Sequence, residues 1–340
     1  MRKSPTVVAL AAGAILTWAH AGYAQAPQPD PKSANYQAKG EQDKTYVFPG
    51  TTESIAYHIY VPMKWDKNTK LPLVILTHGA NQPATAPFQR PMASPTLAKM
   101  AEERGFIVAA VTGYHANATG VGGWNVPYPM VQVQRAPRAG GAAGGGAPGA
   151  GAAAAAPAAA AGAAAAAPGA AAAAGAPGGG GQGGGGRAGR GPAAPPATAE
   201  DFARAEQDII NVRNLMMAEY NADPNRVYLM GNSSGGSAVW NLGAKNPELW
   251  TAISPSAAPL EDANFPYEKL KTVPVLVVHG DMDTTMVFDA SKTMVDHAKA
   301  KGLNVTWLPV LGGQHVDAWA QPEIIKQTFD FFDKYKTKQK

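Results

Sequence analysis

Apolar residues gather in short continuous runs along the chain, and segments with helical spacing separate these runs. A continuous apolar run of this length is typical of a strand that is buried on both faces of a sheet. One earlier segment, residues 55–61, instead shows the two-residue period of a strand. The strands predicted from these patterns comprise residues 45–48, 55–61, 71–77, 106–112, 227–230, 250–254, 273–278 and 305–310.

Helical spacing marks the segments between these strands. Residues 92–104 are followed by Gly105, a common helix stop, and Thr198 with Asp201 resembles a helix start. Because buried strands alternate with helices, the sequence predicts an α/β fold with a mostly parallel central sheet and helices on both of its faces. Functional groups in such sheets gather at the carboxyl ends of the strands. The other predicted helices comprise residues 237–244, 291–301 and 323–335.

Composition divides the chain into parts. It has 340 residues, with 38 Gly, 29 Pro and no Cys. Residues 135–198 form a low-complexity tract of Gly, Ala and Pro, which has almost nothing to bury and is predicted to be a disordered insertion. Residues 25–43 are predicted to be a flexible lead, and residues 44–134 with 199–336 a single folded domain.

Residues 1–24 have the layout of a secretory signal peptide. A basic start at Arg2 and Lys3 precedes an apolar stretch and small residues, with cleavage expected after Ala21 or Ala24. The apolar stretch has about a dozen residues, fewer than the ~20 needed to span a bilayer. The sequence therefore predicts a periplasmic or secreted protein with no stable membrane span after the signal is removed.

Charge and cysteine content exclude several classes of function. The net charge is only +4, and the basic residues near the C-terminus form no basic stripe, which argues against nucleic acid as a partner. The absence of Cys excludes disulfides, thiolate metal sites and cysteine nucleophiles.

The strongest local motif is the Gly-x-Ser-x-Gly sequence from Gly231 to Gly235, which lies between a predicted strand and a predicted helix. A serine on such a turn needs small neighbours two residues before and after it, because the turn brings these neighbours together. This context indicates that Ser233 is a nucleophile. One alternative is a Gly-rich turn in which the serines have no catalytic role. Another is Ser234 as the nucleophile, but Asn232 would then stand two residues before it, where the turn requires a small residue.

A serine hydroxyl needs a base to remove its proton. His315 follows the last predicted strand on a Gly-rich loop and is the predicted general base, whereas His297 lies within a helical pattern. Asp283, just past the strand at residues 273–278, is the predicted acid that orients the imidazole. Asp281 is the alternative acid, although an Asp at that place commonly turns the loop, and Asp317 is interpreted as a loop charge.

The negative charge that forms on an attacked carbonyl oxygen requires donors that are already in place. The backbone N–H groups of Ser234 and Ala80 are the predicted oxyanion hole, and Gly79 permits close approach of the backbone. His78 ends a strand before the nucleophile in the sequence, so we interpret it as a structural hydrogen-bonding residue.

These segments together resemble the α/β-hydrolase superfamily, and within it the secreted esterases that include polyhydroxybutyrate depolymerases and feruloyl esterases. The resemblance covers residues 46–335 apart from the tract, and its motifs are LPLVILTHGA, GWN, DPNRVYLMGNSSGG, PVLVVHGDMD and GGQHVDAW. It implies an α/β-hydrolase fold, a triad of Ser233, Asp283 and His315, and a place for Trp124 near the substrate cleft. Ala80 departs from the Cys that depolymerases often carry there, so the substrate class stays open.

The sequence thus predicts an exported serine ester hydrolase that needs no metal or organic cofactor and acts on a small-molecule or polymeric ester. One alternative is a serine peptidase of the prolyl-oligopeptidase type. Against it, the residues before the predicted hydrolase domain are too few to form the extra domain that usually confers peptide selection in such enzymes. The other is a non-catalytic binding protein with the same fold. Oligomeric state stays open.

Overall fold

A computed structural model of the chain describes residues 26–80, 82, 84–89, 94–114, 124, 126–134 and 198–336. The predicted signal peptide and residues 135–197 of the predicted insertion lie outside these residues. The described residues form an eight-stranded sheet with the order β1-β2-β4-β3-β5-β6-β7-β8. Its strands are β1 (Gly40–Val47), β2 (Ser54–Val61), β3 (Leu73–Thr77), β4 (Ile107–Val111), β5 (Val227–Asn232), β6 (Ala252–Ser256), β7 (Val275–Gly280) and β8 (Val305–Val310).

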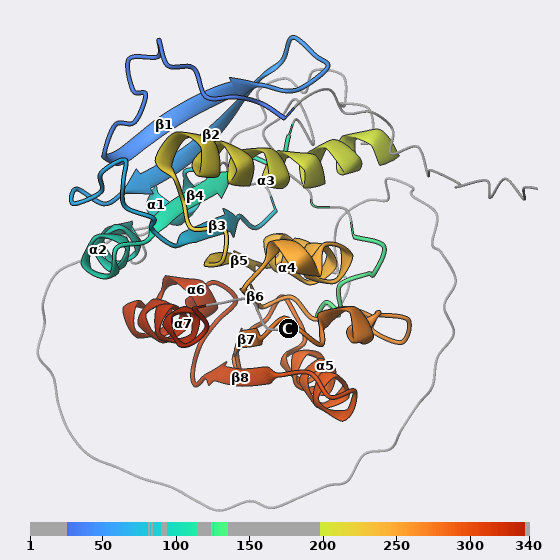
Figure 1. Ribbon diagram of the computed structural model, residues 1–340. Helices are drawn as coiled ribbons and strands as arrows, with labels where there is room; N and C mark the ends of the chain where they lie inside the picture. The colour runs from blue at the N-terminus through green and yellow to red at the C-terminus, as the bar shows by residue number, and fades with distance from the viewer. Residues whose placement is uncertain are drawn as a thin grey trace, which may run out of the picture. The chain divides into compact units, whose positions relative to one another are not determined.

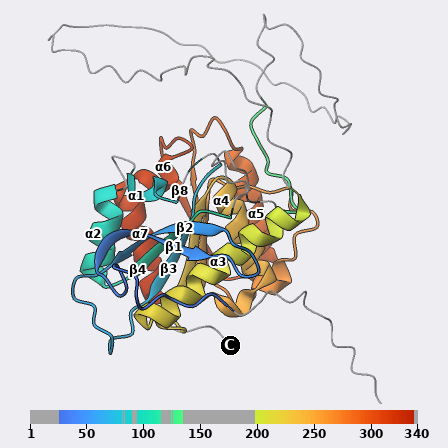
Figure 2. The same cartoon turned by 90° about the horizontal axis from the view of Figure 1, so that it is seen from above.

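The first two strands form an antiparallel edge, and the remaining strands run parallel to one another. Helices cover both faces, with α3, α4 and α5 on one face and α1, α2 and α7 on the other (Figure 1). Figure 2 shows the same division from above, with α2 and α7 on the side opposite α5. The helices are α1 (Ala86–Gln89), α2 (Ser94–Arg104), α3 (Ala199–Tyr220), α4 (Ser234–Lys245), α5 (Phe288–Ala300), α6 (Asp317–Ala320) and α7 (Pro322–Lys334).

The continuous apolar runs have a direct structural reason. In β3, Leu73 and Ile75 belong to the core beneath α3 and α4, whereas Val74 and Leu76 belong to the core beneath α2 and α7. Successive strand side chains point to opposite faces, so a strand covered on both faces needs apolar residues at every position. The predicted fold class is confirmed.

The start of α3 is specified locally. The Thr198 side chain accepts a hydrogen bond from the backbone N–H of Asp201, and the Asp201 carboxylate accepts one from the backbone N–H of Thr198. This reciprocal pair satisfies two N–H groups that a helix otherwise leaves without partners. The helix therefore begins where the sequence predicts, directly after residue 198.

Helix α4 begins at Ser234, earlier than the residues 237–244 predicted from helical spacing. Gly235 and Gly236 have low helix propensity and hide this first turn in the sequence. Tertiary packing requires small residues there: a Cβ atom on Gly236 would lie 2.6 Å from the Cβ atom of Ala258. Close packing thus overrides the local preference.

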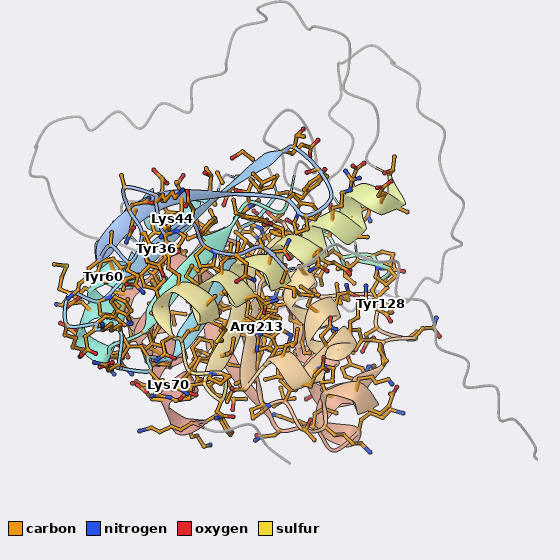
Figure 3. The ribbon with its side chains drawn as sticks, turned by 45° about the horizontal axis from the view of Figure 1, so that its top comes forward. Tyr36, Lys44, Tyr60, Lys70, Tyr128 and Arg213 are labelled. Atoms are coloured by element: carbon orange, nitrogen blue, oxygen red, sulfur yellow. The ribbon has the colours of Figure 1, made fainter. Side chains whose placement is uncertain are left out.

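The first strand begins at Gly40, so the folded domain includes part of the predicted lead. Lys44 of β1 makes a buried ion pair with Glu219 of α3, and its ammonium group also donates to the carbonyl oxygen of Asn35 and the hydroxyl of Tyr220. Lys44 and Tyr36 of the lead are both labelled in Figure 3. The lead is therefore held against the sheet edge by hydrogen bonds.

The helices in the described part of the chain include none that is both long enough and apolar enough to cross a membrane.

Candidate active site

Ser233 occupies a sharp turn between β5 and α4. Its backbone has φ 58° and ψ −126°, a conformation that side-chain-bearing residues rarely adopt. Backbone strain of this kind costs about 1–3 kcal/mol and clusters at functional sites. The backbone N–H of Ser233 donates to the carbonyl oxygen of Ser256 at the end of β6, at 2.9 Å, which ties the turn to the neighbouring strand.

The two glycines of the motif are required by close packing. A Cβ atom on Gly231 would lie 2.0 Å from the Thr77 hydroxyl oxygen and 2.7 Å from the carbonyl oxygen of Gly235. A Cβ atom on Gly235 would lie 2.2 Å from the carbonyl oxygen of Thr77. The turn therefore brings the two glycine positions together, as the Gly-x-Ser-x-Gly motif predicts.

His315 and Asp283 are joined by a hydrogen bond. The imidazole Nδ1 of His315 lies 2.7 Å from Asp283 Oδ2. The Asp283 side chain is fully buried, whereas the His315 side chain keeps 20% of its surface exposed. Ser233 follows the carboxyl end of β5, Asp283 that of β7 and His315 that of β8. These strands run parallel and therefore end at the same edge of the sheet.

The Asp283 carboxylate is held in its charged form. Burial by itself raises the pKa of Asp283, but hydrogen bonds from His279, His315 and two backbone N–H groups outweigh burial and hold the pKa well below its usual range. The backbone N–H groups belong to Thr285 and Met286 and donate to Oδ1 at 2.7 and 3.0 Å. A charged carboxylate can only accept hydrogen bonds, so His315 donates from Nδ1 and its Nε2 is left as the basic nitrogen.

The loops that carry Asp283 and His315 are packed against each other. The backbone N–H of Met282 donates to the carbonyl oxygen of Gly313 at 2.9 Å. A Cβ atom on Gly280 would lie 2.2 Å from that same carbonyl oxygen, so this contact requires glycine. The pairing of the two loops brings the imidazole and the carboxylate within hydrogen-bonding distance.

The alternative carboxylates and histidine have other contacts. Asp281 is exposed, and its Oδ1 accepts from the backbone N–H of Gly312, which joins its loop to the loop after β8. Asp317 accepts from the backbone N–H of Gln314. His297 lies on α5 with more than half of its side chain exposed.

The predicted oxyanion donors lie on either side of the turn. Ser234 is the first residue of α4, and the N–H of a first helical residue has no partner within its own helix. The loop after β3 passes close to Ser233, because a Cβ atom on Gly79 would lie 3.5 Å from the Ser233 Cβ atom. Ala80, the next residue, is exposed. The use of both N–H groups as oxyanion donors stays a prediction.

His78 and Trp124 make hydrogen bonds that hold the loop after β3 in place. The His78 ring nitrogens lie 2.7 Å and 2.9 Å from the carbonyl oxygens of Gly79 and Thr112, and burial lowers the pKa of His78. Trp124 is 7% exposed, and its indole N–H donates to the carbonyl oxygen of His78 at 2.8 Å. Because that N–H is already used, a contact between Trp124 and substrate would involve the ring surface, and this role stays a prediction.

A strand-like segment, residues 129–133, adds a contact that the sequence analysis missed. The backbone N–H of Val131 donates to the carbonyl oxygen of Pro259, and the backbone N–H of Val133 donates to that of Thr285, both at 2.9 Å. The carbonyl oxygen of Val131 accepts from the backbone N–H of Val287. The segment thus joins the loop after β6 to the loop that carries Asp283. Backbone pairing between distant loops leaves no signature in the side-chain pattern.

His279 is the second feature that sequence reasoning missed. It lies in β7 with no exposed surface, and its Nε2 is 3.0 Å from the same Asp283 oxygen that His315 contacts. The signal available in the sequence was a histidine at the end of an apolar strand, directly before Gly280.

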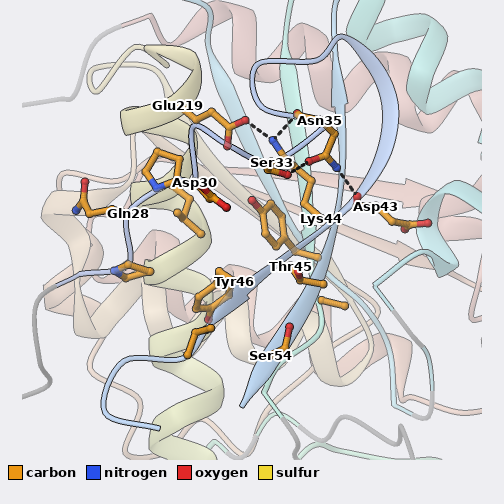
Figure 4. A pocket seen from close by; sticks show the side chains of 16 residues that line it. Gln28, Asp30, Ser33, Asn35, Asp43, Lys44, Thr45, Tyr46, Ser54 and Glu219 are labelled. Atoms are coloured by element: carbon orange, nitrogen blue, oxygen red, sulfur yellow. Dashed lines mark hydrogen bonds and ion pairs between the residues drawn. The ribbon is translucent and has the colours of Figure 1, made fainter. Parts of the chain in front are cut away.

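Two cavities in the described residues lie away from this edge. The larger, about 630 Å³, lies between the lead, β1, β2 and α3. Figure 4 shows that its polar groups bond to one another: Lys44 to Glu219 and Asn35, and Asn35 to the backbone of Asp43. The smaller, about 490 Å³, is lined by the C-terminal end of α4 and neighbouring loops. Neither is lined by Ser233, Asp283 or His315.

Among the described residues, no group of three or more His, Asp or Glu side chains is arranged to hold a metal ion.

Comparison of the sequence with known proteins finds a partial relative. No family model matches the chain. A segment of 93 residues is 30% identical to NocK, a candidate esterase of Nocardia uniformis subsp. tsuyamanensis. This match spans 27% of the chain and a quarter of the length of NocK.

Solved structures resemble the chain over most of its length. A thermostable esterase matches 85% of the chain with a TM-score of 0.51 and 17% identity, and the chain spans 62% of that protein. A ferulic acid esterase matches 87% of the chain and 98% of its own length, with a TM-score of 0.54 and 13% identity. A candidate dipeptidyl aminopeptidase IV of Bacteroides ovatus matches 87% of the chain and 36% of its own length, with a TM-score of 0.52 and 10% identity. Together with the strand order and the serine turn, these matches show that the chain has the α/β-hydrolase fold of these solved proteins.

Proposed function

We propose that the protein is an exported carboxylic ester hydrolase that acts through Ser233, His315 and Asp283. The observation that carries this proposal is the hydrogen bond between His315 Nδ1 and Asp283 Oδ2, at the sheet edge where Ser233 stands in its strained turn. A histidine that is oriented by a buried carboxylate, at the same sheet edge as a serine on a strand-to-helix turn, fits the arrangement used for nucleophilic acyl transfer.

The proposed reaction has two stages. In the first, Ser233 Oγ attacks the ester carbonyl carbon while His315 Nε2 takes the hydroxyl proton, and the imidazolium then gives this proton to the leaving alcohol. In the second, water loses a proton to His315 and attacks the acyl-enzyme, and Ser233 regains its proton as the acid leaves. Asp283 stays charged throughout and stabilises the imidazolium.

The backbone N–H groups of Ala80 and Ser234 would stabilise the oxyanion in both stages. Ser234 supports this role by its place at the N-terminus of α4, where backbone N–H groups and the helix dipole favour negative charge. The proximity of Gly79 to Ser233 supports the role of Ala80.

The proposed export rests on residues 1–24, which lie outside the described residues. Expression of the full chain in a bacterium, with cell fractionation and N-terminal sequencing of the mature protein, tests it. A mature N-terminus directly after Ala21 or Ala24 in the periplasm or medium is expected, and uncleaved protein in the cytoplasm would contradict export.

A serine peptidase is the second candidate function, favoured by the likeness to the dipeptidyl aminopeptidase IV structure. The two candidates share the same proposed chemistry and differ in the bond that is cleaved. Hydrolysis of acetyl esters, feruloyl esters, hydroxybutyrate oligomers and aminoacyl-prolyl amides should be measured side by side. Turnover of the esters is expected, and turnover of the prolyl amides alone would favour the peptidase.

Labelling with a fluorophosphonate tests the nucleophile directly, because this reagent modifies an activated serine without needing the natural substrate. Peptide mass spectrometry is expected to place the adduct on Ser233. Folded protein that takes no label would instead favour a non-catalytic binding protein with the same fold.

A further inference from the structure

One oxygen of Asp283 receives hydrogen bonds from two histidines. Oδ2 lies 2.7 Å from His315 Nδ1 and 3.0 Å from His279 Nε2. His279 lies in β7 and has no exposed surface, so it contacts neither solvent nor an incoming substrate. Its effect on the reaction would have to pass through Asp283.

The direction of these hydrogen bonds is fixed by the charge of Asp283. Since the carboxylate only accepts, His279 donates from Nε2. A neutral imidazole that carries its proton on Nε2 has an acceptor at Nδ1, and Nδ1 lies 2.6 Å from the Ser291 hydroxyl oxygen. The hydroxyl of Ser291 therefore donates to His279, and His279 donates to Asp283.

Ser291 and the ring of His279 are held in place by packing. Ser291 lies on α5 and is 2% exposed. The ring of Phe288, also on α5, packs at a steep angle to the His279 ring with 5.7 Å between the ring centres. Helix α5 thus sets the tautomer of a histidine that bonds to the same Asp283 oxygen as His315.

We propose that His279 and Ser291 are positioning residues that fix the Asp283 carboxylate for His315 and draw part of its negative charge away from the imidazole. This inference rests on the proposed function. A carboxylate oxygen that is shared between two donors stabilises the His315 imidazolium less than one that bonds to His315 alone. Loss of the His279 donor would leave more of the carboxylate's charge facing His315 and so favour the imidazolium over the neutral base.

Two further carboxylates, those of Asp281 and Asp317, lie on or directly after the two loops. The carboxylates of Asp281 and Asp317 accept from the backbone N–H groups of Gly312 and Gln314. Substitution of His279 or Ser291 leaves these carboxylates in place, so a change in the pH dependence would report on Asp283 and His315.

The test compares His279→Leu with His279→Gln, because the Gln side-chain amide offers a donor to Asp283 and Leu offers none. The pH dependence of kcat/KM for a short p-nitrophenyl ester and of the fluorophosphonate labelling rate is measured for each. In His279→Leu, the acid-limb pKa is expected to rise by about half to one unit, and the plateau kcat/KM to fall on the order of tenfold. His279→Gln is expected to restore most of both.

Ser291→Ala removes a single hydroxyl and is a smaller change, which keeps the inference testable if His279→Leu does not fold. It is expected to raise the acid-limb pKa in the same direction by a smaller amount. Folded variants with an acid-limb pKa equal to that of the wild type would overturn the inference, even if kcat fell, since a purely structural role lowers activity without moving this pKa. Wild-type protein that takes no label at Ser233 would overturn the proposed function itself, which is a different result.

Discussion

The backbone N–H of Val133 donates a 2.9 Å hydrogen bond to the carbonyl oxygen of Thr285, two residues after Asp283. The backbone N–H of Thr285 in turn donates to Asp283 Oδ1. The chain directly before residue 135 is therefore attached to the loop that holds the carboxylate. This attachment separates the contribution of residues 129–133 from that of the Gly-, Ala- and Pro-rich residues that follow.

Replacing residues 139–196 with a flexible Gly-Ser linker of about twelve residues is expected to leave hydrolysis of short esters largely unchanged, because the hydrogen bonds from residues 129–133 stay intact. A matched deletion that also removes residues 130–134 is expected to lower kcat/KM by at least about tenfold, since the Asp283 loop loses its partner. Steady-state kinetics on both proteins checks this. Equal activity in the two proteins would show that the segment does not support the loop.

Substitution of Ser233 by Ala or of His315 by Ala is expected to lower the turnover of a short p-nitrophenyl ester by at least ~10³-fold, because each change removes a group that takes part in the covalent step. Circular dichroism should show an unchanged fold. His297→Ala is the control, since His297 is an exposed histidine on α5. Ordinary turnover in the Ser233 and His315 variants would place the site elsewhere.

The two glycines of the turn are expected to be essential for folding. Gly231→Ala and Gly235→Ala would place a Cβ atom within 2.0 and 2.2 Å of Thr77 atoms, and each should cost about 3 kcal/mol or more in the free energy of unfolding. At Gly79 the nearest atom to a new Cβ is 3.5 Å away, an ordinary contact, so Gly79→Ala should change stability by less than about 1 kcal/mol. Urea denaturation of the three variants measures the difference, and similar midpoints would argue against the packing described.

Asp283 is expected to make the stability of the fold depend on acid pH. Its pKa is lower in the folded protein than in the unfolded chain, where it is about 3.9. Its contribution is therefore fully present above the unfolded value and is lost as pH falls toward the folded value. Above about pH 5, the wild type should exceed Asp283→Asn by about 2 kcal/mol in the free energy of unfolding.

This difference between wild type and Asp283→Asn should shrink as pH falls below about 4, because the wild-type carboxylate is then protonated at an increasing cost to the folded state. Urea denaturation at several pH values measures it. Asp281→Asn is the matched control for an exposed carboxylate on the same loop. A difference that stays constant from pH 6 to the lowest pH would contradict the depressed pKa.

The buried pair of Lys44 and Glu219 is expected to hold the lead and β1 on α3. Both side chains are almost fully buried, so Lys44→Met should cost about 3–5 kcal/mol by leaving a buried carboxylate without its partner. Lys44→Met combined with Glu219→Gln should cost less than the sum of the single changes, since neither charge is then left alone. A double-mutant cycle by urea denaturation checks the coupling. Additive effects would show that the pair is not coupled.

Much of the fold could be predicted because its determinants are local. The apolar runs of β3 and β7 reflect burial on both faces, and Thr198 and Asp201 specify the start of α3 by a contact across one helical turn. The turn at Ser233 was also predictable, since only residues as small as Gly231 and Gly235 fit a backbone that folds back on itself so closely.

The sequence by itself determined the alternation of strands and helices, the serine turn and the candidate acid and base, because each depends on neighbours or on residue type. Only the tertiary structure decided that Asp283 bonds to His315 while Asp281 accepts from Gly312 of the neighbouring loop, that His279 bonds to the same Asp283 oxygen as His315, and that residues 129–133 pair with the Asp283 loop. These relationships join segments far apart in the chain, and their geometry depends on how strands of the sheet place their loops, which no local pattern encodes.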